Sequence, residues 1–378
     1  MRKNEMSSIY YISATNIKKH PQGQFPSVSI LLVARNEKRY IRRCLDSLVR
    51  QDYPRERIEF LFIDGCSDDG TYAILEQEVM ELCEGGYIAR LLVNKKKILA
   101  SGWNLGLKEA RGDYVCRIDA HSVIIPSYVS TGVHCLLTPG NEMVAAVGGW
   151  WRHAGATRMG QVIAVLMSSK FAVGDSPFRR RPAAICKTDT AVYGIYRRSV
   201  FSEVGYFDER LARNQDMVMH FRLKTAGYTL LTHPDMEITY YVRNTLGRLL
   251  KKTFGDGKWV ALAGRQYFRL RHKVPFLFVL YLTALLVIYV INGIWFSSIE
   301  AQAIVVVTTI PLLWYGILSI LFSLKALCAL WVRLLLAPLF FAFHVAYGIG
   351  TFCGYCQVLW ERVILIVKCF STDNPKPT

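Results

Sequence analysis

The chain has 378 residues, of which 52% are hydrophobic, and a mean hydropathy of +0.21. It is too apolar to be only a soluble domain and long enough for one domain followed by a membrane part. The net charge of +17 favours anionic lipid or phosphorylated small molecules as partners. Nucleic acid is disfavoured as a partner, because no zinc-finger spacing or aromatic-basic RNA-binding pattern occurs.

The cysteines and the first residues of the chain indicate a cytosolic N-terminal part. The ten cysteines are scattered, and most lie in apolar runs, which is typical of reduced, buried thiols rather than a disulfide framework. Residues 1–27 contain no continuous apolar core that resembles a cleaved signal peptide. We therefore expect the large N-terminal part to stay in the cytosol.

Strands and helices alternate through the first third of the chain. Short apolar, β-rich runs predict strands over 28–34, 58–63, 88–93 and 114–118, and amphipathic spacing predicts helices over 37–51, 71–82 and 98–110. This alternation indicates βαβ units, hence an α/β fold with a mostly parallel, Rossmann-like sheet. Beyond residue 121 the pattern loosens, with helices expected near 127–137, 161–173 and 214–226 and a strand near 143–149.

Three apolar segments follow, over 275–296, 301–322 and 334–355, each near the length that spans a bilayer. The third contains Pro338 and borders Arg333, so a re-entrant hairpin and a surface-lying helix stay open as alternatives. Basic residues crowd 243–273, whereas the link 297–300 has no positive charge. The positive-inside rule then predicts that the large N-terminal part faces the cytoplasm.

These observations predict four parts of the chain. Residues 1–25 form an N-terminal tail, 26–240 an α/β domain, 241–273 a basic amphipathic juxtamembrane segment, and 274–378 a membrane domain with about three transmembrane segments and a polar tail.

Acidic residues and a histidine end two neighbouring predicted strands. Asp64 ends one strand, and Asp119 and His121 follow another, so all three are expected at one edge of the sheet, where open α/β sheets bind ligands. A carboxylate with an imidazole can hold a divalent cation that bridges two phosphates. Neither GxxxxGK[ST] nor GxGxxG occurs, which disfavours a P-loop NTPase and a dinucleotide oxidoreductase.

Six segments carry a family resemblance, in the order VSILLVARNE (28–37), DGCSDDGT (64–71), NLG (104–106), ARGD (110–113), DAH (119–121) and NQD (214–216). Over about residues 26–240 the chain resembles the inverting glycosyltransferases of family 2, which have a GT-A fold. The Asp-Ala-His form and the C-terminal segments look closer to the membrane-anchored exopolysaccharide enzymes of the succinoglycan type.

The resemblance implies a role for each motif residue. Asp64 would accept a hydrogen bond from uracil, and Asp119 would contact the ribose or the metal. His121 would ligate a divalent metal, Mg or Mn, across the diphosphate. Asp216 would be the catalytic base that deprotonates the acceptor hydroxyl. The nucleotide pocket would also be lined by Ala34, Arg35 and Glu37.

Three assignments keep an alternative reading. Asp208 or Glu209 could supply the base in place of Asp216. Arg35 could be a solvated turn residue. The basic residues 179–181 could grip phosphate or form a solvated loop.

The leading hypothesis is a nonprocessive, metal-dependent hexosyltransferase of exopolysaccharide or cell-surface biosynthesis. It would move a sugar from a nucleotide donor, expected to be UDP-linked, to a lipid-linked saccharide acceptor at the cytoplasmic face of the inner (plasma) membrane. Anionic membrane lipid would contact residues 243–273. Two alternatives are a processive polysaccharide synthase, whose motif after the base is degenerate at 255–259, and a noncatalytic nucleotide-sugar or lipid-binding protein.

Overall fold

The computed structural model describes residues 25–295 and 299–372. Almost all of the predicted N-terminal tail, the start of the link 297–300 and the last residues of the polar tail lie outside the described residues. The chain forms two compact units. The first contains Met1–Arg152, Ser176–Glu209 and Met219–Tyr240, and the second contains His153–Asp175, Arg210–Val218 and Tyr241–Thr378.

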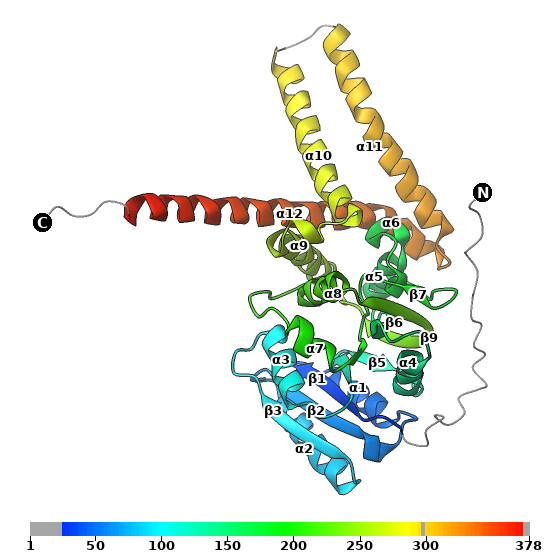
Figure 1. Cartoon of the computed structure of the whole chain (residues 1–378). Coiled ribbons are helices and arrows are strands. Elements are labelled where there is room, and N and C mark those ends of the chain that lie inside the picture. The colour runs from blue at the N-terminus through cyan, green and yellow to red at the C-terminus, as the bar shows by residue number, and fades with distance from the viewer. Residues whose placement is uncertain (1–24, 296–298, 373–378) are drawn as a thin grey trace, which may run out of the picture. The chain divides into compact units, whose positions relative to one another are not determined.

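The first unit is built on one mixed sheet, whose opening half is the predicted βαβ alternation (Figure 1). Strands β3, β2, β1 and β4 lie side by side in parallel, in that order. The elements of this half are β1 (Val28–Ala34), α1 (Ile41–Val49), β2 (Ile58–Asp64), α2 (Thr71–Glu84), β3 (Ile88–Val93), α3 (Leu99–Glu109) and β4 (Tyr114–Asp119), with a 3-10 turn at Arg55–Arg57.

The other half of the sheet is antiparallel. Strand β8 pairs with β4, β6 pairs with β8, and β5 and β7 both pair with β9. The elements of this part of the chain are β5 (Ser122–Ile124), α4 (Tyr128–Leu137), β6 (Val144–Ala154), a 3-10 turn at Pro177–Arg179, β7 (Cys186–Lys187), β8 (Ile195–Arg197), α7 (Val200–Val204), α8 (Gln215–Thr225) and β9 (Thr229–Tyr241). The predicted α/β fold is thereby confirmed, but the sheet is mixed rather than mostly parallel, because the second half of the domain adds antiparallel strands.

The composition of the strands explains the position of the core. All seven residues of β1 and all seven of β2 are buried, as expected for strands covered on both faces. Trp103 of α3 is fully buried and packs with Leu31 of β1 and Ile63 of β2. This packing holds the carboxyl ends of the strands in fixed positions, and those ends carry the predicted site residues.

The second unit is helical. It contains α5 (Arg158–Ser168), α6 (Lys170–Val173), α9 (Leu246–Ala263), a 3-10 turn at Arg265–Tyr267, α10 (Leu270–Trp295), α11 (Ile299–Lys325) and α12 (Leu330–Thr372). Helix α12 packs against α9, α10, α11, α5 and α6. Within the described residues, three helical stretches are long and apolar enough to cross a membrane: Leu270–Asn292, Gln302–Lys325 and Leu330–Ile364.

Several predicted boundaries differ from the observed ones. The helix expected over 161–173 is two helices, because Ser169 has extended backbone angles and its side chain accepts a hydrogen bond from the Phe171 N–H. The helix expected from residue 37 begins at Ile41, after a turn. The thirteen-residue strand β9 was not predicted.

Candidate functional site

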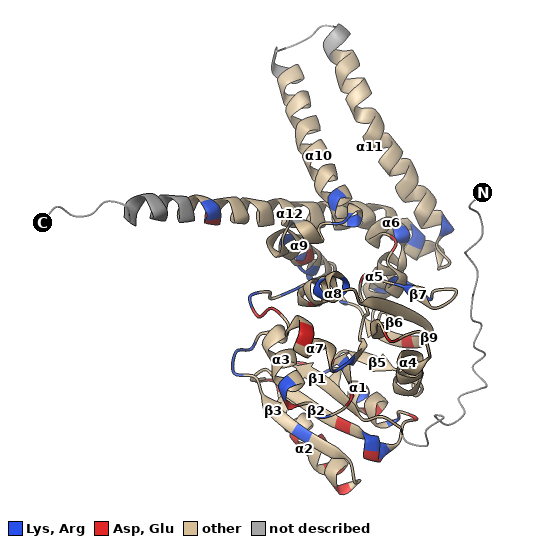
Figure 2. Ribbon diagram, in the orientation of Figure 1, with Lys and Arg blue, Asp and Glu red and all other residues tan. Residues whose placement is uncertain are grey.

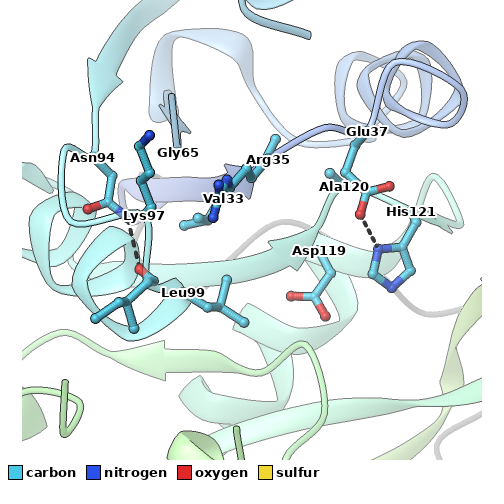
Figure 3. Close-up of a pocket in the computed structure, with 12 residues that line it drawn as sticks. Val33, Arg35, Glu37, Gly65, Asn94, Lys97, Leu99, Asp119, Ala120 and His121 are labelled. Atoms are coloured by element: carbon cyan, nitrogen blue, oxygen red, sulfur yellow. Dashed lines mark hydrogen bonds and ion pairs between the residues drawn. The ribbon is translucent and has the colours of Figure 1, made fainter. Parts of the chain in front are cut away.

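A pocket of about 190 Å³ opens at the carboxyl edge of the parallel strands (Figure 3). It brings together four of the residues predicted to bind nucleotide and the predicted metal ligand His121. The lining residues come from the ends of β1 and β4, the loop after β2, and the segment between β3 and α3. They are Val33, Ala34, Arg35, Glu37, Gly65, Asn94, Lys97, Ile98, Leu99, Asp119, Ala120 and His121.

The loops after β1 and β2 are joined by hydrogen bonds. The Asn36 N–H donates to the Ser67 hydroxyl (3.0 Å), the Glu37 N–H to the Thr71 hydroxyl (2.9 Å), and the Lys38 N–H to the Asp69 carboxylate (3.0 Å). The Asp69 carboxylate also accepts the Thr71 N–H and hydroxyl protons. The polar run 64–71 therefore fixes the backbone that presents Arg35 and Glu37 to the pocket.

Asp64 is 1% exposed at the end of β2. Its Oδ2 accepts a hydrogen bond from the Ser67 N–H (2.9 Å), whereas its Oδ1 is buried and has no hydrogen-bond partner among the described residues. The adjoining Gly65 lines the pocket, although Asp64 itself does not. A buried acceptor without a donor costs free energy unless a ligand supplies one, so this oxygen fits the N–H of a bound base.

Asp119 and His121 lie on the same side of the pocket, as Figure 3 shows. The Asp119 carboxylate receives no hydrogen bond from the residues that the structure describes. The His121 Nδ1 lies 3.2 Å from the Glu37 Oε1, and the imidazole also packs edge-on against Tyr240. Glu37 therefore orients the ring, with Nδ1 donating and Nε2 left for another partner.

Burial and charge act in opposite directions on His121. Burial lowers the pKa of the imidazole, but the hydrogen bond that it donates to Glu37, helped by the charges of Tyr240, Glu37 and Asp119, raises it to about 9. The imidazolium form is consequently the main one near neutral pH when no cation is bound. A cation at Nε2 would replace one proton and leave the other on Nδ1.

The donor set fits a divalent cation only if a substrate completes it. No cluster of three or more histidine, cysteine or acidic side chains that could hold a metal occurs in the described parts of the chain. Asp119 and His121 offer one oxygen and one nitrogen. Mg²⁺ and Mn²⁺ accept such a pair when phosphate oxygens and water supply the remaining positions, which is the usual arrangement at nucleotide sites.

The segment between β3 and α3 adds pocket residues that the sequence did not single out. Asn94 is buried, donates from Nδ2 to the Ile98 carbonyl and accepts from the Ser101 hydroxyl. Lys97 has a left-handed backbone (φ 59) and its side chain lines the pocket. A lysine held in a disfavoured conformation beside the pocket is a candidate phosphate contact. Its signal in the sequence is the Lys95-Lys96-Lys97 run directly after a strand.

Glu209, one alternative for the base, is held by two partners in the first unit. Its carboxylate accepts from Asn104 Nδ2 (2.9 Å) and forms an ion pair with Lys96 Nζ (2.6 Å). The hydrogen bond from Lys96, followed by that from Asn104, lowers its pKa. Asn104 also exchanges two hydrogen bonds with the backbone of Phe207. These contacts anchor the 205–209 turn and make Glu209 a poor proton acceptor.

Asp216 belongs to the second unit, on the first turn of α8, and does not line the pocket. Its Oδ1 accepts a hydrogen bond from the Met217 N–H (2.9 Å). The residues just before it are tied to α9, because Arg213 pairs with Asp256 (3.1 Å) and Asn214 donates to the Asp256 carbonyl. The second unit thus holds the segment that presents Asp216.

The basic residues 179–181 make protein contacts in the first unit. The Arg179 guanidinium lies 5.0 Å from the Trp151 ring centre, and Arg181 pairs with Asp235 (2.9 Å). Neither residue lines the pocket. These contacts agree with a structural loop rather than a phosphate grip.

Known proteins resemble this chain in sequence. Residues 29–205 match the family model for glycosyl transferase family 2. The chain is 25% identical over 281 residues to a dolichyl N-acetyl-alpha-D-glucosaminyl phosphate 3-beta-D-2,3-diacetamido-2,3-dideoxy-beta-D-glucuronosyltransferase of Methanococcus voltae, covering 73% of this chain and 86% of that protein. It is 27% identical over 247 residues to the succinoglycan biosynthesis protein ExoA of Rhizobium meliloti, covering 65% of this chain and 70% of that protein.

A solved structure shares the fold. The mannosyltransferase PcManGT from Pyrobaculum calidifontis, solved with GDP-Man and Mn²⁺, superposes with a TM-score of 0.54 at 19% identity, covering 86% of this chain and 87% of that one. The predicted GT-A fold is thereby confirmed, and the pocket lies at its strand ends. Residues 29–205 form a glycosyltransferase family 2 domain, and the chain is a glycosyltransferase with three C-terminal helices that could span a membrane.

Proposed function

We propose that this glycosyltransferase transfers one sugar, with inversion, from a UDP-linked donor to a lipid-linked saccharide. The observation that carries the proposal is the pair Asp119 and His121 in the pocket, with His121 oriented by Glu37. This arrangement suits a nucleoside diphosphate whose charge needs compensation.

The donor base binds near the end of β2. The free Oδ1 of Asp64 accepts the imide N–H of uracil, and the Ala34–Glu37 backbone forms the adjoining wall. Lys97 reaches the phosphates as a point charge. Guanine also presents N–H donors, so the donor test includes GDP-sugars.

Asp119 and His121 Nε2 would hold a divalent cation, Mg²⁺ or Mn²⁺, against the diphosphate. The cation would neutralise the charge that builds on the departing nucleoside diphosphate. Because this chain supplies only one oxygen and one nitrogen donor, we expect the cation and the nucleotide to bind more tightly together than separately.

Asp216 is the base in this proposal. Its carboxylate takes the proton from the acceptor hydroxyl as the hydroxyl oxygen bonds to the anomeric carbon, while the bond from that carbon to the diphosphate oxygen breaks on the opposite face. The configuration at the anomeric carbon is inverted, and no covalent sugar–enzyme intermediate forms.

The enzyme acts at the cytoplasmic face of the inner (plasma) membrane, as part of exopolysaccharide or other surface-saccharide synthesis. The basic residues of α9 and of the start of α10 support this placement, since they favour anionic headgroups and a cytoplasmic location. The relatives named above include one whose name specifies a dolichyl-phosphate-linked acceptor.

The test is a donor screen with membranes that contain the overproduced chain. Labelled UDP- and GDP-sugars are supplied with lipid extract, with and without a chelator, and the products are sized. We expect a UDP-sugar to give a product one sugar longer, and only when a divalent cation is present. Long products would favour the processive synthase, and no transfer with any donor would favour the noncatalytic alternative.

A further inference from the structure

Helix α12 differs from the other two apolar helices in length and surroundings. It runs from Leu330 to Thr372, 43 residues, which corresponds to about 65 Å at about 1.5 Å per residue. A bilayer core is only about 30 Å thick. In its apolar window 39% of residues are buried within the protein, compared with 11% for α10 and 6% for α11.

Helix α12 crosses one end of the α10–α11 pair rather than lying along it (Figure 1). Helices α10 and α11 are antiparallel, with the Tyr281 hydroxyl donating to the Thr308 carbonyl. The hydrogen bonds and ring contacts with α12 involve the first three turns of α10 and the last three turns of α11, which form the same end of the pair. They include His272–Tyr347, Phe276–Tyr355, Phe278–Phe341, Tyr315–His344 and Ser319–Ala337.

The inner face of α12 lies directly on the charged helix α9. A Cβ at Gly257 of α9 would collide with the Tyr347 carbonyl oxygen, and a Cβ at Gly350 of α12 would collide with the Phe254 carbonyl oxygen. Helix α9 carries Lys251, Lys252, Asp256 and Lys258 within this stretch. Charged side chains are expensive in hydrocarbon, so the part of α12 that touches α9 belongs at headgroup level.

A buried histidine ties α12 to two further helices at this level. The Phe171 carbonyl of α6 can only accept, so His344 donates to it from Nε2 (3.0 Å) and accepts the Tyr315 hydroxyl proton of α11 at Nδ1 (2.8 Å). His344 is 6% exposed. These bonds fix the rotation of α12 about its own axis, and hence which face points outward.

The outer face of α12 is an exposed apolar stripe, which we call the α12 stripe. Its members recur at helical spacing between Trp331 and Trp360: Trp331, Leu334, Ile349, Phe352, Leu359 and Trp360. An apolar stripe of this length on one face is far larger than an exposed patch on a soluble surface. A helix with one packed face and one exposed apolar face is typical of a helix that lies in the membrane interface.

Basic residues at the same end of the α10–α11 pair indicate which partner contacts the α12 stripe. Figure 2 shows Lys and Arg at α9, at the start of α10 and at the end of α11, whereas residues 274–295 of α10 and 302–324 of α11 include no charged residue. The basic residues include Arg269, Arg271, Lys273, Lys325 and Arg333. Basic residues in this position favour contact with anionic lipid headgroups.

We propose that α12 does not cross the bilayer but lies in its plane, with the α12 stripe buried at the boundary of headgroups and acyl chains of an anionic membrane. The chain then crosses the membrane twice, through α10 and α11. This inference requires only that α10 and α11 span, and it does not depend on the transfer reaction.

The first test counts the crossings in the otherwise unaltered chain. One epitope tag is placed before Met1 and another after Thr378, and each is exposed to protease in sealed membrane vesicles. Two crossings put both tags on the same side, so we expect both to be cleaved or both to be protected. Tags on opposite sides would overturn the proposal, because they require an odd number of crossings.

The second test measures depth, because a re-entrant hairpin also returns the chain to its starting side. Spin labels are placed at Leu334, Ile349 and Leu359 of the α12 stripe, in a background whose reactive cysteines are replaced, with Leu313 in the middle of α11 as the control. Vesicles contain anionic phospholipid, and depth is read from oxygen and nickel accessibility.

We expect the three labels on α12 at one shallow depth and the label at Leu313 near the bilayer centre. A spanning α12 would separate Leu334 and Leu359 by about 37 Å in depth. A depth difference of that kind, a deep Ile349, or strong spin–spin broadening from a second copy seated on the stripe would each overturn the proposal.

Discussion

The two units of this protein position their candidate functional residues in different ways. In the first unit, the pocket is assembled from the ends of adjacent strands, and Glu37, Asp119 and His121 each lie within three residues of the end of a strand. In the second unit, the segment before Asp216 is held by contacts with α9 that are distant in sequence. We therefore expect that substitutions in the two units disturb donor binding and proton removal separately.

The largest expected effect comes from replacing Asp216, the proposed base in the second unit. Asp216→Asn should lower turnover by about 10²–10⁴-fold, because the acceptor hydroxyl loses its base, while UDP affinity stays unchanged. Turnover is measured by product formation and UDP binding by calorimetry. Asp208→Asn and Glu209→Gln are the matched controls and should keep measurable turnover. Normal activity in Asp216→Asn would remove this residue from the mechanism.

Within the second unit, a lysine substitution should distinguish α11 from α12. Leu313→Lys places a charge at the centre of a spanning helix at a cost of about 3 kcal/mol and should reduce membrane insertion. Ile349→Lys lies on the α12 stripe, where the side chain can reach the headgroups, and should insert normally. Insertion is measured by carbonate extraction of membranes. Equal loss in both variants would contradict an in-plane α12.

The close packing of α12 against α9 should also contribute to the free energy of unfolding. Gly350→Ala forces a methyl group onto the Phe254 carbonyl and should lower the free energy of unfolding by about 1–3 kcal/mol. Gly316→Ala in α11, where no atom lies within 4 Å, is the control and should be neutral or slightly stabilising. Thermal unfolding in detergent gives both values. An unchanged melting temperature in Gly350→Ala would argue against the α9–α12 contact.

In the first unit, Glu37→Gln should have a smaller effect that acts through His121. The amide can no longer hold the imidazole by charge, so Mn²⁺ affinity in the presence of UDP should fall about tenfold, the lower end of the usual effect of losing such a partner. Binding of Mn²⁺ is followed by electron paramagnetic resonance. Arg35→Gln, on the same loop, is the control and, with UDP saturating, should leave Mn²⁺ affinity unchanged.

The pocket residues at strand ends were easier to predict from the sequence than the positions and contacts of the loop residues beside them. Asp64, Asp119 and His121 stand at strand ends, and strand ends on one edge of a parallel sheet must meet. Lys97 was missed, because a run of three lysines reads as solvated charge until its left-handed backbone and its place in the pocket are seen. The contact between Glu37 and His121 spans 84 residues and depends on the curvature of two loops.

The same contrast holds for the secondary structure. The strands of the parallel half are continuous apolar runs and were predicted closely. Strand β9 was missed, because Pro234 and the charged Asp235 and Glu237 interrupt its apolar pattern, and its pairing with β5 and β7 is what stabilises it. For α12, apolar length predicted a membrane helix, but its direction depends on packing against α9, which no local pattern reveals.

The most direct test of the central claim is UDP binding to the purified protein with and without Mn²⁺. If the pocket is a nucleotide–cation site, Mn²⁺ should tighten UDP binding in the native protein, and both Asp119→Asn and His121→Ala should abolish that tightening while Asp216→Asn retains it. Tightening by Mn²⁺ that survives in Asp119→Asn and His121→Ala would contradict the account.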